Sequence, residues 1–189
     1  MPRLYLVRHA KPFVPSRDNR DPALDSGGLE QAAAMARSLA PPAPLPLISS
    51  PLLRCRQTAE PLAQIWNREA SIEDAVREVP FRTQDGIERA RALNALLRMR
   101  WEDALAGSDG AQLGRWRAEL IGVLQSLREE TVIVTHFVPI NVVVGLAIGN
   151  DAVTAFEPAH ASVTIVDAED GLFRLRRLGA QAKTQVTSG

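Results

Sequence analysis

The chain has 189 residues, which is enough for one well-packed core, and we expect a single domain. Its 22 basic and 22 acidic residues balance, so charge gives no reason to expect a nucleic-acid or membrane partner. The only cysteine, Cys55, excludes an intrachain disulfide. With three widely separated histidines it makes no zinc pattern, and we expect no metal and no cofactor. No apolar run is long enough to cross a membrane and no signal-peptide pattern opens the chain, so we expect a cytoplasmic protein.

The first predicted element is a strand over residues 4–7, a continuous apolar run that leads directly into Arg8 and His9. Runs without polar alternation are typical of strands that are buried on both faces. Parallel sheets carry their chemistry beyond the carboxyl ends of such strands, which is where Arg8 and His9 would lie. An isolated pair of this kind more often caps a strand at the surface, so the assignment depends on the rest of the chain.

A helix is predicted over residues 29–39, followed by a proline-rich connector and a short strand at residues 47–48. Ser49 and Ser50 before Pro51 are a helix-start signal, and the helix they predict runs to about Trp66. Its first turns carry Arg54 and Arg56. Arginines beside the free amides of a helix N-terminus make a plausible phosphate cradle, although they could also be solvated.

Residues 70–79 are predicted to form a strand and a loop, and residues 87–106 and 112–128 two helices. Two successive helices between strands indicate a helical cap over one end of the sheet, which we assign to residues 82–128. Trp101 and Trp116 fall on the apolar stripes of these helices and are predicted to belong to the core.

A second buried strand, residues 131–135, ends at His136, and an almost wholly apolar helix is predicted over residues 139–148. Strands at residues 161–166 and 172–178 read as a hairpin. The alternation of strands and helices predicts a three-layer α/β/α sandwich with a mainly parallel sheet, an antiparallel edge and the small helical cap. We expect one domain over residues 1–179 and a flexible tail over residues 180–189.

Four polar residues can meet at the strand ends. Arg8, His9, Arg54 and His136 each follow a strand or begin a helix. Two guanidinium groups and two imidazoles describe an oxyanion site, most naturally one for phosphate. A neutral imidazole can also attack phosphorus and carry the phosphoryl group as an intermediate. Glu78, just before the cap, is the carboxyl best placed in sequence to protonate a leaving alkoxide.

The chain resembles the histidine phosphatase superfamily, also called the phosphoglycerate mutase-like family. Residues 6–10 resemble its Arg-His-Gly signature, and residues 49–60 are close to its Ser-Pro-Leu-x-Arg-Ala-x-Gln-Thr-Ala-Glu block. Further segments follow in the family's order, at residues 25–32, 77–81, 132–136 and 161–164. Such a series is far more specific than a single motif.

The resemblance implies that His9 is the phosphorylated nucleophile and Glu78 the proton donor. It makes Arg8, Arg54 and His136 the phosphate ligands, and favours Arg54 over Arg56. His160 falls where the family often has Asn, so it is either a residue bordering the pocket or a structural one.

The chain also departs from the family pattern. Ala10 and Phe137 replace glycines, and Phe137 would narrow the pocket or give it an aromatic wall. The segment after Phe81 lacks the family's motif, which leaves Asp85 and Glu88 as alternative acids.

The function we expect is a phosphomonoesterase for a small phosphorylated molecule, working through phosphohistidine at His9. The alternatives are a phosphoglycerate mutase-type transferase, a protein phosphohistidine phosphatase and an inactive phosphate-binding regulatory module. The short chain and small cap favour hydrolysis over mutase activity. Arginines of the cap could recognise a carboxylate of the substrate or be merely solvated; they are Arg82, Arg89, Arg91, Arg98 and Arg115. The sequence does not specify the substrate or the oligomeric state.

Overall fold

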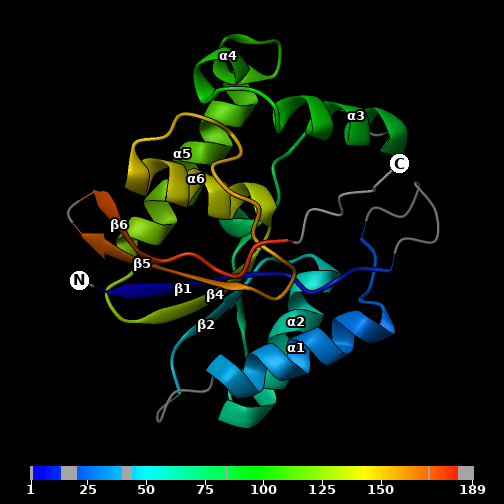
Figure 1. The fold of residues 1–189 in the computed structure, drawn as a ribbon, viewed down its shortest axis with the longest axis vertical. Helices are drawn as coiled ribbons and strands as arrows, with labels where there is room; N and C mark the ends of the chain where they lie inside the picture. The colour runs from blue at the N-terminus through cyan, green and yellow to red at the C-terminus, as the bar shows by residue number, and fades with distance from the viewer. Residues whose placement is uncertain (1, 14–20, 40–43, 84, 170, 183–189) are drawn as a thin grey trace, which may run out of the picture.

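A computed structural model (Figure 1) describes residues 2–13, 21–39, 44–83, 85–169 and 171–182. Its strands are β1 (Arg3–Arg8), β2 (Leu47–Ser49), β3 (Ser71–Ile72), β4 (Thr131–Thr135), β5 (Val163–Glu169) and β6 (Leu172–Arg177). Its α-helices are α1 (Ser26–Leu39), α2 (Leu53–Trp66), α3 (Gly86–Leu96), α4 (Trp101–Ala106), α5 (Gly110–Ser126) and α6 (Phe137–Ile148). A short 3₁₀ helix, η1 (Asp74–Val76), follows β3.

The six strands of the described residues form one sheet in the order β3-β2-β4-β1-β5-β6. Strands β1 to β4 run parallel to one another, and β5 and β6 form the antiparallel edge. Helices α1 and α2 cover one face of the sheet, while α5 and α6 cover the other (Figure 1). The predicted three-layer sandwich with its antiparallel edge is therefore confirmed.

The parallel strands at the centre of the sheet bring the predicted site residues to one edge. Arg8 pairs with Thr135, and Ser49 pairs with Val134 in the neighbouring strand. The carboxyl ends of β1, β2 and β4 therefore lie side by side. The residues that follow these strands are His9, Ser50 and His136, and all three are buried.

Two apolar clusters hold the layers together, one on each face of the sheet. Alternate residues of the strands face opposite layers, so Leu6 and Ile133 belong to the cluster under α5 and α6, whereas Val7 and Val134 belong to the one under α2. The buried strands thus show no polar alternation in sequence, although their side chains do alternate in space. Trp101 and Trp116 are buried, as predicted.

The helical cap differs from the prediction in one respect, because the segment predicted as one helix over residues 87–106 is broken. Helix α3 ends at Leu96, and α4 begins at Trp101. Between them the chain pairs with the segment after α6, where Trp101 N–H donates to the carbonyl oxygen of Asp151 and Met99 O accepts from Val153 N–H. These distant contacts interrupt a helix that local periodicity favours.

A second prediction, that Ser49, Ser50 and Pro51 start a helix, is wrong. Helix α2 begins at Leu53, and its N-cap residue Leu52 makes no side-chain capping bond. The hydroxyl of Ser50 is instead 2.8 Å from Nε2 of His136. The same hydroxyl lies 3.4 Å from the amide of Leu52, so the shorter of its two contacts is the long-range one.

At the carboxyl end of the chain, the described residues 180–182 lie beside the segment that precedes β5. The amide of Ala159 donates to Ala180 O, and that of Ala182 donates to Glu157 O. The rest of the predicted tail, residues 183–189, lies outside the described residues, as does most of the predicted loop between β1 and α1.

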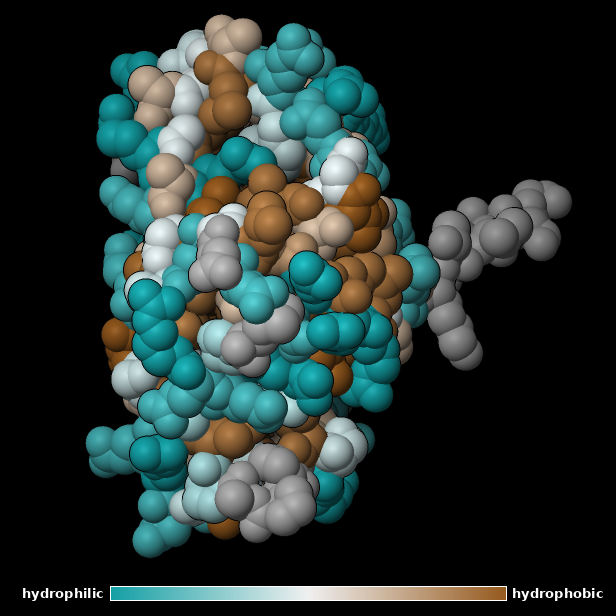
Figure 2. Space-filling model, turned by 90° about the vertical axis from the view of Figure 1, so that its left-hand side faces the viewer, coloured by the Kyte–Doolittle hydropathy of each residue, from teal (hydrophilic) through white to brown (hydrophobic). Residues whose placement is uncertain are grey.

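Hydrophilic residues cover much of the face shown in Figure 2, with patches of apolar residues between them. Among the described residues, we find no helix that combines the length and the apolar character needed to cross a membrane.

Candidate active site

His9 lies at the carboxyl end of β1 and is 6% exposed. Its backbone amide donates to Thr135 O at 2.9 Å, and its ring Nδ1 is 2.9 Å from Ala10 O. Because a carbonyl oxygen can only accept, Nδ1 carries the ring proton and Nε2 keeps its lone pair. Burial, together with the positive charges of Arg54 and Arg8, lowers the pKa of His9 well below 6.5. The ring is therefore neutral near pH 7.

Arg8 is held by the segment that precedes β5. Its Nη1 donates to Pro158 O at 2.7 Å, and its guanidinium carbon lies 5.1 Å from the centre of the Phe137 ring. The same segment bonds the backbone around Arg8, because Ala161 N–H donates to Arg8 O at 3.0 Å. His160 Nδ1 is 3.1 Å from His9 O, and its ring centre lies 5.4 Å from that of His9.

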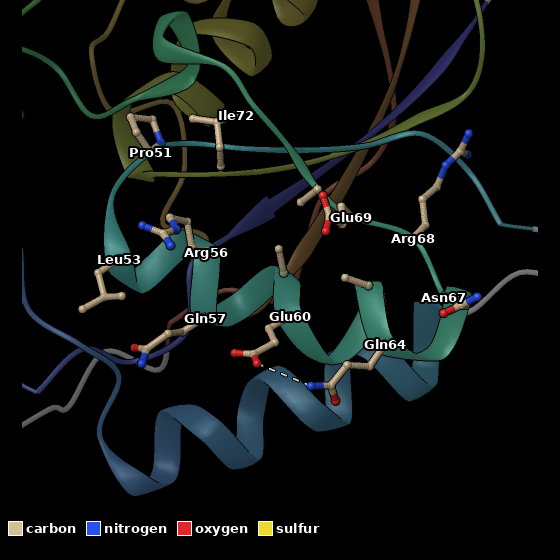
Figure 3. Close-up of a pocket in the computed structure, with 13 residues that line it drawn as sticks. Pro51, Leu53, Arg56, Gln57, Glu60, Gln64, Asn67, Arg68, Glu69 and Ile72 are labelled. Carbon is tan, nitrogen blue, oxygen red and sulfur yellow. Dashed lines mark hydrogen bonds between the residues drawn. The ribbon is translucent and has the colours of Figure 1, made fainter.

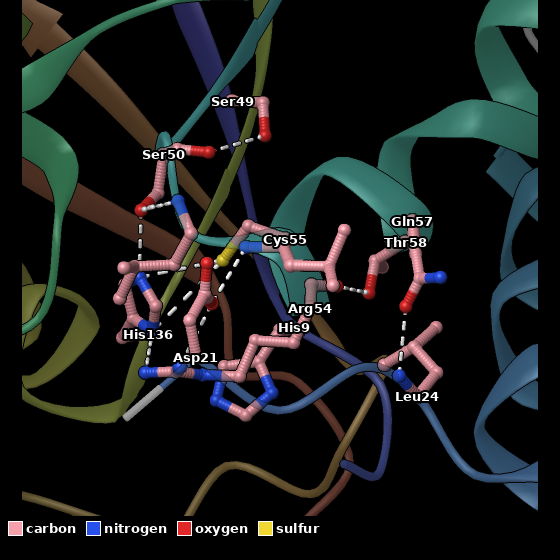
Figure 4. Close-up of polar contacts among 12 residues, drawn as sticks. His9, Asp21, Leu24, Ser49, Ser50, Arg54, Cys55, Gln57, Thr58 and His136 are labelled. Carbon is pink, nitrogen blue, oxygen red and sulfur yellow. Dashed lines mark hydrogen bonds and ion pairs between the residues drawn. The ribbon is translucent and has the colours of Figure 1, made fainter. Parts of the chain in front are cut away.

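Arg54 lies in the first turn of α2 and contacts His136, as Figure 4 shows. Arg54 Nη2 is 3.2 Å from Nδ1 of His136, and Ser50 Oγ is 2.8 Å from Nε2. An arginine can only donate, so His136 accepts at Nδ1 and donates from Nε2 to Ser50. Burial and the charge of Arg54 lower the pKa of His136 well below 6.5, which keeps the ring in the neutral form that this arrangement requires.

The N-terminus of α2 is capped by Asp21, which lies far from it in sequence. Asp21 Oδ1 accepts from the amide of Leu53 at 2.7 Å and lies 3.8 Å from Arg54 Nη1. A carboxylate at this position interacts favourably with the helix dipole. It also helps to fix the guanidinium of Arg54 at the edge of the site.

Glu78, in the loop after η1, is partly buried and lines the same cavity as His9. Its Oε1 accepts from the amides of Val79 at 3.1 Å and Val138 at 3.3 Å. Burial raises the pKa of this carboxyl, although the two amides and the charges of Arg54 and Arg8 oppose the shift. The arrangement favours a carboxylic acid that keeps its proton at a higher pH than usual.

A cavity of about 530 Å³ brings these side chains together. Its lining includes Arg8, His9, Arg54, Glu78, Phe137 and His160. His136 is fully buried and is not part of the lining; its ring centre lies 5.2 Å from that of His9. The structure therefore gathers the predicted site residues in one place, with His136 held behind Arg54.

The alternative acids lie elsewhere. Asp85 caps α3 by accepting from the amides of Ile87 and Glu88, and Glu88 accepts from the hydroxyl of Thr83 at 2.7 Å. Neither carboxyl belongs to the lining of the cavity. Of the three acids considered, Glu78 alone shares the cavity with His9.

Arg56 points away from the site. It is exposed and lines a separate groove of about 830 Å³ on the outer side of α2, together with Glu60, Gln64 and Arg68 (Figure 3). The two arginines at the start of α2 thus face different cavities, and Arg54 is the one that faces His9. The described residues contain no cluster of three or more His, Cys, Asp or Glu side chains that could hold a metal ion.

Sequence reasoning missed several side chains that hold the site in place. Thr58 Oγ1 accepts from the amide of Ala10 at 2.9 Å and donates to Arg54 O at 2.6 Å, which joins β1 to α2. Asn141 Oδ1 accepts from the amides of Ala155 and Phe156, which secures the start of the segment that holds Arg8. A lone Asn in an otherwise apolar helix was the available signal for the second contact.

Most of the chain matches a known protein family. A family model for the histidine phosphatase superfamily (branch 1) matches residues 4–181. The chain belongs to this superfamily. Among curated protein sequences, none matches it significantly.

Several solved structures share the fold at low sequence identity. A phosphoserine phosphatase from Entamoeba histolytica, crystallised with 3-phosphoglyceric acid, has a TM-score of 0.70 and 20% identity over 98% of both chains. A mycobacterial glucosyl-3-phosphoglycerate phosphatase, solved with VO3, has a TM-score of 0.72 and 21% identity over 96% of this chain and 100% of its own. A third structure, of a protein from Thermus thermophilus, has a TM-score of 0.67 and 23% identity over 94% and 99% of the two chains. At these identities the likeness establishes the fold.

Proposed function

We propose that this histidine phosphatase superfamily member is a phosphomonoesterase that works through a phosphohistidine intermediate on His9. The observation that carries the proposal is the bond between Nδ1 of His9 and Ala10 O, because it leaves the lone pair of Nε2 for attack. The lowered pKa of His9 keeps that lone pair unprotonated near neutral pH. The raised pKa of Glu78 favours the acid form of a carboxyl that lines the same cavity. An imidazole whose pKa is lowered and a carboxyl whose pKa is raised fit a neutral nucleophile and a general acid.

The phosphoryl group is bound by Arg8 and Arg54. Both guanidinium groups are oriented before substrate arrives, Arg8 by Pro158 O and Arg54 by His136. Donors that are already in place stabilise charge on the phosphoryl oxygens without reorganisation during the reaction. His136 acts on the phosphate mainly by holding Arg54, and it remains a phosphate ligand only if Arg54 moves when substrate binds.

In the first step, Nε2 of His9 forms a bond to phosphorus while the bond from phosphorus to the ester oxygen breaks. The departing oxygen takes the proton of Glu78 and leaves as an alcohol. In the second step, the Glu78 carboxylate takes a proton from water as the water oxygen attacks phosphorus. The nitrogen–phosphorus bond breaks, which releases inorganic phosphate and restores neutral His9 and protonated Glu78. Ala10 O stabilises the charged ring of the intermediate by accepting from Nδ1–H.

The test measures phosphate release from 4-nitrophenyl phosphate and from an alkyl phosphate. We expect His9→Ala to abolish turnover while its circular dichroism spectrum stays that of the parent protein. Arg54→Ala should lower kcat/KM by about 10²–10³-fold, as the loss of one preorganised donor does in other enzymes. Arg56→Ala is the matched control, because Arg56 lines a different groove, and it should leave kcat/KM unchanged.

Substantial turnover by His9→Ala would overturn the proposal, because it would require another nucleophile. A mutase would differ by returning the phosphoryl group to an added acceptor alcohol faster than to water. Equal losses in the Arg54 and Arg56 variants would contradict the assignment of the phosphate cradle.

A further inference from the structure

The cavity that contains His9 has a charged part and an apolar part. Beyond the residues around the phosphate site, the cavity is lined by residues of α3 and of the first turn of α6. The apolar residues of its lining are Pro12, Pro22, Ala90, Leu93, Leu97, Phe137 and Val138. A volume of about 530 Å³ falls in the range of small-molecule sites, and a phosphoryl group fills only a minor part of it. The remaining space is bounded mainly by hydrocarbon.

The apolar side chains that line the cavity are not fully covered by the protein. Leu93, Leu97 and Phe137 pack against the main core cluster with part of each side chain, but each is only partly buried. The rest of their surface borders the cavity. Covering such surface with an apolar group is favourable in proportion to the area removed from water. A polar leaving group in the same position would lose its hydration and find few partners.

Arg89 is the charged residue that α3 contributes to this lining. It also lines an adjoining cavity of about 370 Å³, which shares Glu78 with the first. Three arginines and three acids line that adjoining cavity: Arg77, Arg89, Arg115, Asp74, Glu78 and Glu119. Arg77 forms an ion pair with Asp74 at 3.0 Å, and the two cavities share only Glu78 and Arg89, so we place the rest of the substrate on the apolar wall and not in the adjoining cavity. The other arginines of the cap, Arg82, Arg91 and Arg98, line neither cavity.

We infer that the substrate is a phosphate monoester of an apolar alcohol, whose hydrocarbon part binds between α3 and the start of α6. This inference rests on the proposed phosphomonoesterase function and deepens it. Phe137 and Leu93 are specificity residues in this account. Phe137 lies in the lining with its ring centre 5.1 Å from the guanidinium carbon of Arg8, so an aromatic wall stands beside the phosphate site.

The test compares kcat/KM for propyl, butyl, pentyl and hexyl phosphate, with glycerol phosphate and 4-carboxybutyl phosphate as polar and anionic counterparts. The simple alcohols have nearly the same basicity, so differences among them report binding of the leaving group in the transition state. We expect kcat/KM to rise about three- to fourfold for each added methylene. Pentyl phosphate should exceed 4-carboxybutyl phosphate at least tenfold. A flat series, or a preference for the carboxylated or glycerol ester, would overturn the inference.

Variants in α3 and at its C-cap residue Leu97 locate the apolar site. Leu93→Ser should reduce the ratio of kcat/KM for hexyl over propyl phosphate several-fold, and Leu97→Ser provides a second substitution if the first fails to fold. Ile87→Ser is the matched control, because Ile87 is 40% exposed on the same helix and does not line the cavity. The ratio of kcat/KM for hexyl over propyl phosphate should be the same in Ile87→Ser as in the parent protein. If this ratio is also unchanged in both leucine variants, the inference is contradicted.

4-Nitrophenyl phosphate separates the two proposals. If it is hydrolysed while the alkyl series is flat, the phosphomonoesterase function stands and the apolar substrate class is wrong. If neither it nor any alkyl ester is hydrolysed, the proposed function fails, and the inference fails with it.

Discussion

Replacing Glu78 by Gln tests the role of the acid with little change in shape. Oε1 of Glu78 accepts from the amides of Val79 and Val138, and the amide oxygen of Gln can accept both bonds. The substitution therefore removes the transferable proton and retains the contacts that hold the side chain. A loss of activity in a folded Glu78→Gln protein would then report proton transfer and not local collapse.

The size of the loss depends on the leaving group. General acid catalysis contributes about 10²–10⁴-fold, so we expect kcat/KM for hexyl phosphate to fall by that factor. 4-Nitrophenolate leaves readily without a proton, and its ester should lose no more than about tenfold. The assay is initial-rate phosphate release for both esters, with the melting temperature of each protein as the control for folding. Equal losses for the two esters would refute the reasoning, because they would show that Glu78 does not protonate the leaving group.

The Glu78→Gln variant should also change the pH dependence of activity. The pKa of Glu78 lies above its ordinary 4.5, and activity on an alkyl ester should decline as pH rises through that pKa, because the acid loses its proton. The pKa of His9 lies below 6.5, so activity should decline again as pH falls through it. Glu78→Gln should lose the decline at high pH and keep the decline at low pH that protonation of His9 causes. A profile unchanged from the parent would contradict this assignment.

Three further predictions concern stability. Ser50→Ala removes the acceptor of His136 Nε2–H and should lower the free energy of unfolding by about 1–3 kcal/mol in urea titrations, whereas Ser38→Ala, on the surface side of α1, should cost less. Asn141→Leu removes bonds to three backbone groups and should lower the free energy of unfolding by about 3 kcal/mol. Because two of these bonds secure the segment that holds Arg8, KM should also rise, and an unchanged KM would contradict that link. Because burial lowers the pKa of His136, the unfolded chain takes up a proton below pH 6.5 that the folded chain resists. Between pH 7 and 5.5 the free energy of unfolding should therefore fall less for His136→Gln than for the parent protein. The two slopes should differ by up to about 1.4 kcal/mol per pH unit, and equal slopes would show that His136 does not contribute to the pH dependence of stability.

Much of the site could be predicted because it depends on strand ends. The buried strands before His9 and His136 are visible as apolar runs, and parallel pairing brings their carboxyl ends to one edge. Arg54 could be placed in the same way, because it lies in the first turn of a helix that follows a strand. These residues owe their positions to regular secondary structure, which local patterns predict well.

The rest depends on contacts between segments far apart in the chain. Asp21 caps α2 although 32 residues separate it from Leu53, and no local pattern indicates that contact. Ser50 was assigned to a helix cap by its neighbours, yet His136 takes its hydroxyl. The break between Leu96 and Trp101 likewise comes from pairing with the segment around Asp151. In each case a tertiary hydrogen bond replaces the partner that the local sequence favours.

The proposed mechanism requires Nε2 of His9 to carry the phosphoryl group. The most direct measurement is rapid quenching of the protein during turnover of 4-nitrophenyl phosphate, followed by mass spectrometry of the intact chain and of its peptides. We predict one phosphoryl group, stable in base and labile in acid, on the peptide that contains His9, and none in His9→Ala. A phosphoryl group on another residue, or turnover with no trapped intermediate at any quench time, would contradict the account.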